Sequence, residues 1–268
     1  MRWQFASVLV VLCTLVSGVG ADEKKARILL IGKELDHPYG THMYMFECRL
    51  LAKCLEQTPG VQTIVSKGWP KDPKTLEGVN SIVFYTREGG DVLFAGKHRK
   101  QAIELMKNGV GLVAIHWGTG AGKLTGEIWQ KTLGGWFHRR YVGSRLQTTK
   151  AEVRPVAPDH PVCYGWKAYP LRDEYYLDLK YMPNTKPVIK VKIGKEDHTI
   201  GWVYERPKSK GGRSFGCVLG HFHENFGEKP FRQALINGIL WTAHVDVPKA
   251  GAPCEIVPKD LVLPKRKK

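Results

Sequence analysis

The chain has 268 residues, of which 43% are hydrophobic and 10% aromatic, so it can bury a sizeable core, and this excludes an intrinsically disordered protein. Its formal net charge of +16 favours acidic partners, but the Lys and Arg residues are scattered and form no stripe with interleaved aromatic residues. We therefore expect a solvated basic surface and no nucleic-acid partner.

The first 21 residues have the pattern of a secretory signal peptide. Arg2 supplies a positive charge, residues 5–16 form a short apolar stretch, and Val19-Gly20-Ala21 ends in small residues, which predicts cleavage before Asp22. The stretch is too short and wrongly flanked for a typical membrane span, and an uncleaved anchor is the alternative. We expect a periplasmic or secreted protein with no membrane span after cleavage.

Five cysteines are left after this cleavage. Export permits disulfides, but an odd number of cysteines without Cys-x-x-Cys spacing argues against zinc-ribbon and thioredoxin-like motifs. We expect mostly free, buried thiols at Cys48, Cys54, Cys163, Cys217 and Cys254.

The first half of the remaining chain alternates between short apolar runs and helical patterns. Apolar runs without polar alternation are typical of buried parallel strands. The expected strands are residues 27–32, 61–65, 79–86 and 110–115, and the expected helices are residues 41–57 and 92–107. This order predicts an α/β fold with a doubly wound, mostly parallel sheet and helices on both faces, in three layers as in flavodoxin.

The second half is expected to extend this sheet. It contains patterns for an edge strand at residues 145–154, for strands at 188–193, 201–205 and 214–219, and for helices at 125–133 and 229–243. Residues 134–140 and the basic residues 207–212 are expected to be loops. We expect one domain over residues 22–246 and a Pro- and Lys-rich tail over residues 247–268.

His116 ends the fourth expected strand and precedes a glycine-rich turn at residues 117–122. A reactive residue at the tip of such a strand, with glycines behind it, is the pattern of a nucleophile elbow. Histidine at this place suits a metal ligand or an acid–base group better than an acyl-transfer nucleophile.

A second histidine cluster follows the strand at 214–219, where His221, Phe222, His223 and Glu224 are consecutive. Open α/β sheets place their sites at the carboxyl ends of strands, which favours a functional role. In an extended strand, side chains at positions i and i+2 lie on the same face. His221 and His223 follow the end of the strand, where a turn between them would point the two side chains in different directions. We expect only one of the two histidines to serve the pocket, and structural histidines are the alternative.

Three further stretches carry candidate residues. The loop after the first strand contains His37, and the loop at 134–140 contains aromatic residues beside His138. Residues 172–176 place two carboxylates next to two tyrosines and an arginine. Both a metal or sugar-hydroxyl site and a solvated charge cluster fit that last stretch.

Together these segments resemble the ThuA-like (trehalose utilisation) family, whose fold is that of class I glutamine amidotransferases. The resemblance spans residues 27–244 and rests on His37, residues 111–116, Gly134-Gly135 with His138, His160-Pro161, residues 173–175, Trp202, residues 212–215, residues 219–221 and Trp241. It implies a role in disaccharide catabolism through keto-sugar intermediates, with a small carbohydrate as partner. Because His116 stands where the amidotransferases have their cysteine, it also implies that this chain is not a cysteine-dependent amidotransferase.

The resemblance and the histidine pattern together define the candidate site. The catalytic candidates are His116, His221 and Glu174; the substrate-binding candidates are His37, Trp117, His138, Tyr175 and His223; the metal-ligand candidates are His37, His116, Asp173 and His221. A divalent zinc or manganese ion suits such a ligand set. We expect an exported hydrolase or isomerase of keto-sugars or glycosides, and a non-catalytic carbohydrate-binding or scaffold domain is the alternative.

Overall fold

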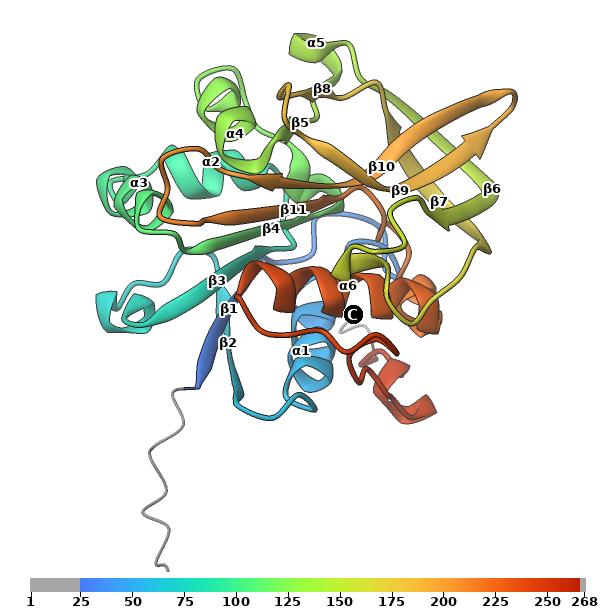
Figure 1. Cartoon of the computed structure of the whole chain (residues 1–268), viewed down its shortest axis with the longest axis horizontal. Coiled ribbons are helices and arrows are strands. Elements are labelled where there is room, and N and C mark those ends of the chain that lie inside the picture. Colours follow the sequence, from blue (N-terminus) through green and yellow to red (C-terminus); the bar gives the residue numbers. More distant parts are fainter. Residues whose placement is uncertain (1–24, 266–268) are drawn as a thin grey trace, which may run out of the picture.

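A nine-stranded sheet runs through the centre of the molecule (Figure 1). The computed structural model describes residues 25–265, so the signal peptide predicted at residues 1–21 lies outside the described residues. The strands follow the order β2-β1-β3-β4-β11-β10-β9-β6-β7 across the sheet. Five of these strands form a parallel half, and the other four form an antiparallel half.

The parallel half confirms the predicted mostly parallel α/β architecture. Its strands are β2 (Val61–Lys67), β1 (Ala26–Gly32), β3 (Val79–Phe84), β4 (Gly111–Ile115) and β11 (Arg213–Cys217). Residues 28–31 and 112–115 have no exposed surface. Unbroken apolar runs are what strands need when both faces of the sheet are covered.

The antiparallel half comprises β10 (Glu196–Glu205), β9 (Lys186–Ile193), β6 (Arg145–Pro155) and β7 (Tyr169–Leu177). We expected an edge strand at residues 145–154, but β6 pairs with β7 along its length and with β9 at residues 153–155. The edge strand of the antiparallel half is β7, which contains the carboxylate and tyrosine stretch at residues 172–176. A separate two-stranded sheet joins β5 (Gly135–Trp136) to β8 (Lys180–Tyr181).

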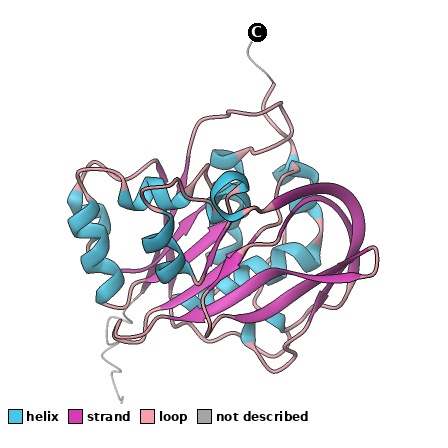
Figure 2. Ribbon diagram, turned by 90° about the horizontal axis from the view of Figure 1, so that it is seen from above, coloured by secondary structure: helices cyan, strands magenta, loops and turns pink. Residues whose placement is uncertain are grey.

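Helices cover both faces of the parallel half (Figures 1 and 2). One face carries α1 (Tyr44–Leu55) and α6 (Lys229–Thr242), and the other carries α2 (Gly89–Phe94), α3 (Arg99–Lys107) and α4 (Gly126–Leu133). A further short helix, α5, spans Arg139–Val142. Short 3-10 helices are η1 (Pro73–Leu76), η2 (His116–Thr119), η3 (Pro161–Cys163), η4 (His223–Gly227) and η5 (Pro258–Leu261).

The helix predicted at residues 92–107 is instead two helices, with a break at residues 95–98. Gly96 lies in this break, and glycine has a low helix propensity. The imidazole Nε2 of His98 donates to the carbonyl of Val92 at 2.7 Å, so a side chain satisfies a carbonyl group near the end of α2.

The segment after α6 returns across α1 and α6. Ala252 and Cys254 are buried, and the guanidinium of Arg232 donates to the carbonyl of Cys254 at 3.2 Å. All five cysteines of the described residues are free and buried, as predicted. Among residues 25–265, no helix has both the length and the apolar character needed to cross a membrane.

Candidate functional site

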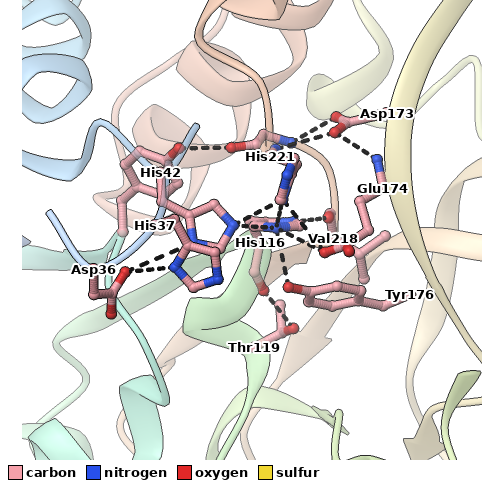
Figure 3. A network of polar contacts seen from close by, with 12 residues as sticks. Asp36, His37, His42, His116, Thr119, Asp173, Glu174, Tyr176, Val218 and His221 are labelled. Carbon is pink, nitrogen blue, oxygen red and sulfur yellow. Dashed lines mark hydrogen bonds and ion pairs between the residues drawn. The ribbon is translucent and has the colours of Figure 1, made fainter. Parts of the chain in front are cut away.

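Three histidines and a glutamate converge at the carboxyl edge of the parallel strands (Figure 3). They are His42, His116, Glu174 and His221. Each offers one potential ligand atom, a ring nitrogen or a carboxylate oxygen, and these four atoms all lie within 4.8 Å of one another. His42 Nε2 lies 2.9 Å from His221 Nδ1 and 3.0 Å from His116 Nε2. Glu174 Oε2 lies 3.4 Å from His221 Nδ1 and 3.6 Å from His116 Nε2. We call these four residues the histidine cluster.

His116 occupies the tip of β4 in the left-handed backbone region, with φ of 52°. This conformation is uncommon for a non-glycine residue and matches the expected elbow, because the chain turns directly into η2. His116 Nδ1 donates to the carbonyl of Val218 at 2.7 Å. Since a neutral imidazole carries one proton, His116 Nε2 presents a lone pair to the cluster.

His42 comes from the loop after β1, and His221 comes from the loop after β11. The backbone N–H of His42 donates to the carbonyl of His221 at 3.0 Å, which joins the two loops. Tyr44 Oη lies 2.9 Å from His42 Nδ1 and fixes the orientation of that ring. The topology therefore brings residues from opposite ends of the chain to one point.

Asp173 supports this arrangement from the protein interior. Its buried carboxylate accepts backbone N–H groups from Gly220 at 2.7 Å, His221 at 3.0 Å and Glu174 at 2.8 Å. Burial raises the pKa of Asp173 to about 6, although these hydrogen bonds act in the opposite direction. Asp173 therefore holds the loop that carries His221 and is not one of the four clustered residues.

Burial keeps the innermost imidazoles neutral. Burial, together with the charges that His37 and His221 would carry, lowers the pKa of His42 to about 3. Burial and the neighbouring His42 also hold the pKa of His116 well below its ordinary value. Ring nitrogens that face one another at 2.9–3.3 Å need a shared proton or a cation between them.

The separations in the cluster suit a four-coordinate metal ion. Zinc binds imidazole nitrogen at about 2.0–2.1 Å, so two ligands of a tetrahedral site lie about 3.3 Å apart. The nitrogen separations of 2.9, 3.0 and 3.3 Å and the nearest carboxylate separation of 3.4 Å are close to that value. The residues present therefore fit a divalent ion of the zinc type.

His37 lies beside the cluster. Its Nδ1 is 2.7 Å from Asp36 Oδ1, and its ring centroid is 3.8 Å from that of His42. Asp36, His37 and His42 form a second group of potential ligands. The His37 side chain is 26% exposed, whereas His42 and His116 are buried, so His37 is at the mouth of the site.

The other predicted substrate-binding residues are spread around the site. The half-buried Trp117 ring lies 5.1 Å from the His37 ring and 5.7 Å from the His42 ring, between centroids. His138 Nδ1 accepts the backbone N–H groups of Arg140 and Tyr141 at the start of α5. Tyr175 donates to the carbonyl of Leu171 at 2.8 Å, on the face of β7 away from Glu174.

Tyr176, next in β7, is the tyrosine that reaches the cluster. Its hydroxyl lies 3.0 Å from His116 Nε2, and its ring stacks on that of His116 with centroids 4.5 Å apart. His223 points instead toward α1 and the C-terminal segment. Its Nδ1 lies 2.5 Å from Glu47 Oε1, and its Nε2 donates to the carbonyl of Leu261 at 2.8 Å.

Sequence reasoning missed His42 and the partnership between Asp36 and His37, and it included Tyr176 in the candidate stretch at residues 172–176 but assigned the site role to Tyr175. One signal for His42 was its position in the same loop as His37, after the first buried strand. No cysteine in the described part of the chain joins the cluster, and burial raises the pKa of Cys217, the last residue of β11, to about 12.

Comparison with known proteins gives a family match over most of the domain. Residues 39–242 match the ThuA family, described as trehalose utilisation. A ThuA-like protein from Bacteroides uniformis ATCC 8492 has a TM-score of 0.62 and 19% identity, over 83% of this chain and 93% of that chain. A ThuA-like protein from Parabacteroides merdae ATCC 43184 has a TM-score of 0.62 and 16% identity, over 89% of this chain and 99% of that chain. These identities establish a shared fold alone, and no curated protein matches the chain.

Proposed function

This chain belongs to the ThuA (trehalose utilisation) family, which supports a carbohydrate-related role, and we propose that it is a metal-dependent hydrolase or isomerase of keto-sugars or glycosides. The observation that carries this proposal is the convergence of three imidazole nitrogens and one carboxylate within 4.8 Å. Buried neutral imidazoles with converging lone pairs are suited to binding a cation.

His42 Nε2, His116 Nε2, His221 Nδ1 and Glu174 Oε2 would hold a zinc or manganese ion. Such an ion, when bound, supplies Lewis-acid polarisation of a substrate carbonyl oxygen. The chain itself orients these ligands: the Val218 carbonyl fixes the tautomer of His116, and Asp173 fixes the backbone of His221. Supporting contacts of this kind hold ligand groups in place and tune their basicity.

His37 is the residue that we assign to proton transfer. Asp36 accepts the proton of His37 Nδ1 at 2.7 Å, which leaves Nε2 as a proton acceptor. No described residue makes a hydrogen bond to His37 Nε2. A carboxylate-oriented imidazole at the mouth of the site is suited to removing a proton next to a sugar carbonyl.

Exposure of the side chains is consistent with substrate entry from solvent. His42 and His116 are buried at the floor, whereas Glu174 is 21% exposed and His221 is 15% exposed. A substrate carbonyl therefore approaches past His37, Glu174 and His221. We also propose export of the protein, on the pattern of residues 1–21.

Elemental analysis of the purified protein tests the metal. We expect about one equivalent of zinc or manganese in the wild type and its loss in His116→Ala and in His221→Ala. His244→Ala is the matched control, because His244 is exposed, lies outside the cluster and uses its imidazole in a hydrogen bond to the Gly211 carbonyl. A wild type without metal, or full metal retention in both cluster variants, would refute the metal site.

Turnover is tested separately with the metal-loaded protein and a panel of keto-glycosides. We expect hydrolysis or isomerisation that His37→Ala slows by about 10²–10⁴-fold, as is usual for loss of an acid–base group. Tight glycan binding with no turnover of any keto-glycoside would favour the non-catalytic carbohydrate-binding alternative.

A further inference from the structure

A cavity lies beside the histidine cluster. It has a volume of about 190 Å³ and is lined by Glu88, Trp117, Gly120, Phe137, His138 and Arg139. These residues come from the turn after β3, from η2 and the residue that follows it, and from the segment that joins β5 to the first residue of α5. Only Trp117 and His138 were singled out from the sequence as substrate-binding residues.

Two aromatic walls connect the cavity to the cluster. Trp117 lies against His37 and His42, with centroids 5.1 and 5.7 Å away. Phe137 stacks on Tyr176 with centroids 3.9 Å apart and an interplanar angle of 12°, and the Tyr176 hydroxyl lies 3.0 Å from His116 Nε2. A ligand in the cavity is therefore separated from the cluster by one aromatic ring on the Trp117 side and by two stacked rings on the Phe137 side.

Polar groups with unused hydrogen-bonding capacity line the same cavity. His138 Nδ1 already accepts two backbone N–H groups, so the proton of the neutral ring is on Nε2. Neither His138 Nε2 nor the Trp117 indole N–H has a hydrogen-bond partner among residues 25–265. Both are donors for ligand oxygens.

Glu88 is held in a strained conformation at the cavity. Its backbone is left-handed, with φ of 49°, and its N–H donates to the carbonyl of Trp117 at 3.1 Å. Strained non-glycine backbone persists where the surrounding structure enforces it, and it is frequent at ligand-binding sites. The hydrogen bond fixes the backbones of Glu88 and Trp117 relative to each other, and both residues line the cavity.

We infer that this cavity is a subsite for a neutral sugar ring, so that the substrate has two parts, one at the histidine cluster and one sugar ring between Trp117 and Phe137. Aromatic walls with a few fixed donors and acceptors suit a ring that has apolar faces and hydroxyl edges. Arg87 lies over the Trp117 ring at 4.7 Å from its centroid, and Asp91 neighbours Glu88. Two guanidinium groups, Arg87 and Arg139, are therefore balanced by two carboxyl groups, which favours a neutral ring over an anion. The cavity is smaller than the ~300 Å³ of the smallest typical drug-sized pockets, so it takes one ring.

This inference rests on the proposed function and extends it to a disaccharide or another glycoside. The test is calorimetric titration of the metal-loaded full chain with methyl glucoside and, separately, with glucuronate. We expect methyl glucoside to bind, and Glu88→Gln and Arg139→Ala each to weaken binding by about tenfold with unchanged metal content. Arg139 is exposed, so its variant keeps the fold even if Glu88→Gln does not.

Glu127→Gln is the matched control, because Glu127 is exposed on α4 and does not line the cavity. His116→Ala separates the two proposals: it is expected to lose the metal and keep methyl glucoside binding. The subsite is overturned if methyl glucoside does not bind, if both cavity variants bind it like wild type, if glucuronate binds more tightly, or if binding disappears together with the metal.

Discussion

His221 and His223 are two residues apart, yet they serve two regions with opposite chemistry. His221 joins His42 and His116, where burial and neighbouring imidazoles lower the pKa values of the two inner rings. His223 faces the buried carboxylate of Glu47. Burial alone would lower the pKa of His223, but the hydrogen bond and charge of Glu47 outweigh it, and the net pKa is raised.

The difference shows that neighbours, rather than residue type, decide what a histidine does. Imidazoles that face each other stay neutral and offer lone pairs, which favours cation binding. An imidazole between a carboxylate and a carbonyl is favoured in its protonated form and links parts of the chain. His223 thereby ties α1, through Glu47, to Leu261 of the C-terminal segment.

The largest expected effect is the loss of the proposed activity on removing a cluster histidine. His42→Ala removes a nitrogen that lies within 3.0 Å of both other cluster nitrogens. We expect loss of bound metal and a fall in turnover of at least about 10³-fold, measured by elemental analysis and steady-state kinetics.

His223→Ala is the matched variant in the other region and is expected to keep its metal. Equal metal loss in the two variants would break the distinction between the regions.

The next effect is on stability. His223→Ala leaves the Glu47 carboxylate buried with no partner, and Glu47 Oε2 already has none. Burial raises the pKa of Glu47 to about 7 even beside His223, so the unpaired carboxyl group takes up a proton and remains a buried polar group without a partner. We expect a decrease of about 3 kcal/mol in the free energy of unfolding, measured by urea denaturation at neutral pH. Lys67→Ala, which removes an exposed ion pair with Glu34, is the control and is expected to change stability little. A similarly small change for His223→Ala would show that the pair does not hold this region together.

A smaller effect is expected for Asp173→Asn, which tests support of the cluster from behind. The carboxylate accepts three backbone N–H groups, and the amide that replaces it has one oxygen and two N–H donors. We expect metal affinity to fall by about 10–100-fold, the usual range for groups that orient ligands, in a chelator competition assay. Unchanged affinity would mean that the His221 loop keeps its place without this carboxylate.

Much of the fold follows from the sequence because the parallel strands are unbroken apolar runs. The exceptions have local causes: Gly96 and the His98 side chain divide one expected helix, and β7 covers the side of β6 that we expected to be open. Strand pairing in the antiparallel half depends on contacts between distant segments, which local patterns do not specify.

The site was partly predictable for a similar reason. The ends of parallel strands meet at one edge, which places His116 and His221 together. Which face of β7 points toward the cluster was not predictable, because each face of residues 173–176 carries one carboxylate and one tyrosine. The register puts Glu174 and Tyr176 at the cluster, and Asp173 and Tyr175 on the other face. His42 was overlooked because residues 41–57 were expected to be helical, whereas α1 begins at Tyr44.

His160 gives the smallest expected effect and is a case in which burial is the largest cause of the pKa shift and no other imidazole contributes. It packs on Trp241, with centroids 4.9 Å apart, and burial, followed by the charges of Lys186 and Arg213, lowers its pKa to about 4, with Glu205 acting in the opposite direction. Above about pH 6.5 neither the folded nor the unfolded state protonates this group, so its contribution to stability is fully present. As pH falls from 6.5 to 4, only the unfolded state gains the proton, and stability is lost.

His160→Asn keeps an acceptor for the Val162 N–H, to which His160 Nδ1 is bonded at 3.3 Å, and removes the titration. We expect urea denaturation at pH 7 and pH 4.5 to show that the variant loses about 1 kcal/mol less stability than wild type on acidification, a value reduced for the partial exposure of the ring. An identical pH dependence in the two proteins would mean that burial against Trp241 does not suppress protonation, and that the low pKa values in the histidine cluster depend on its neighbouring imidazoles.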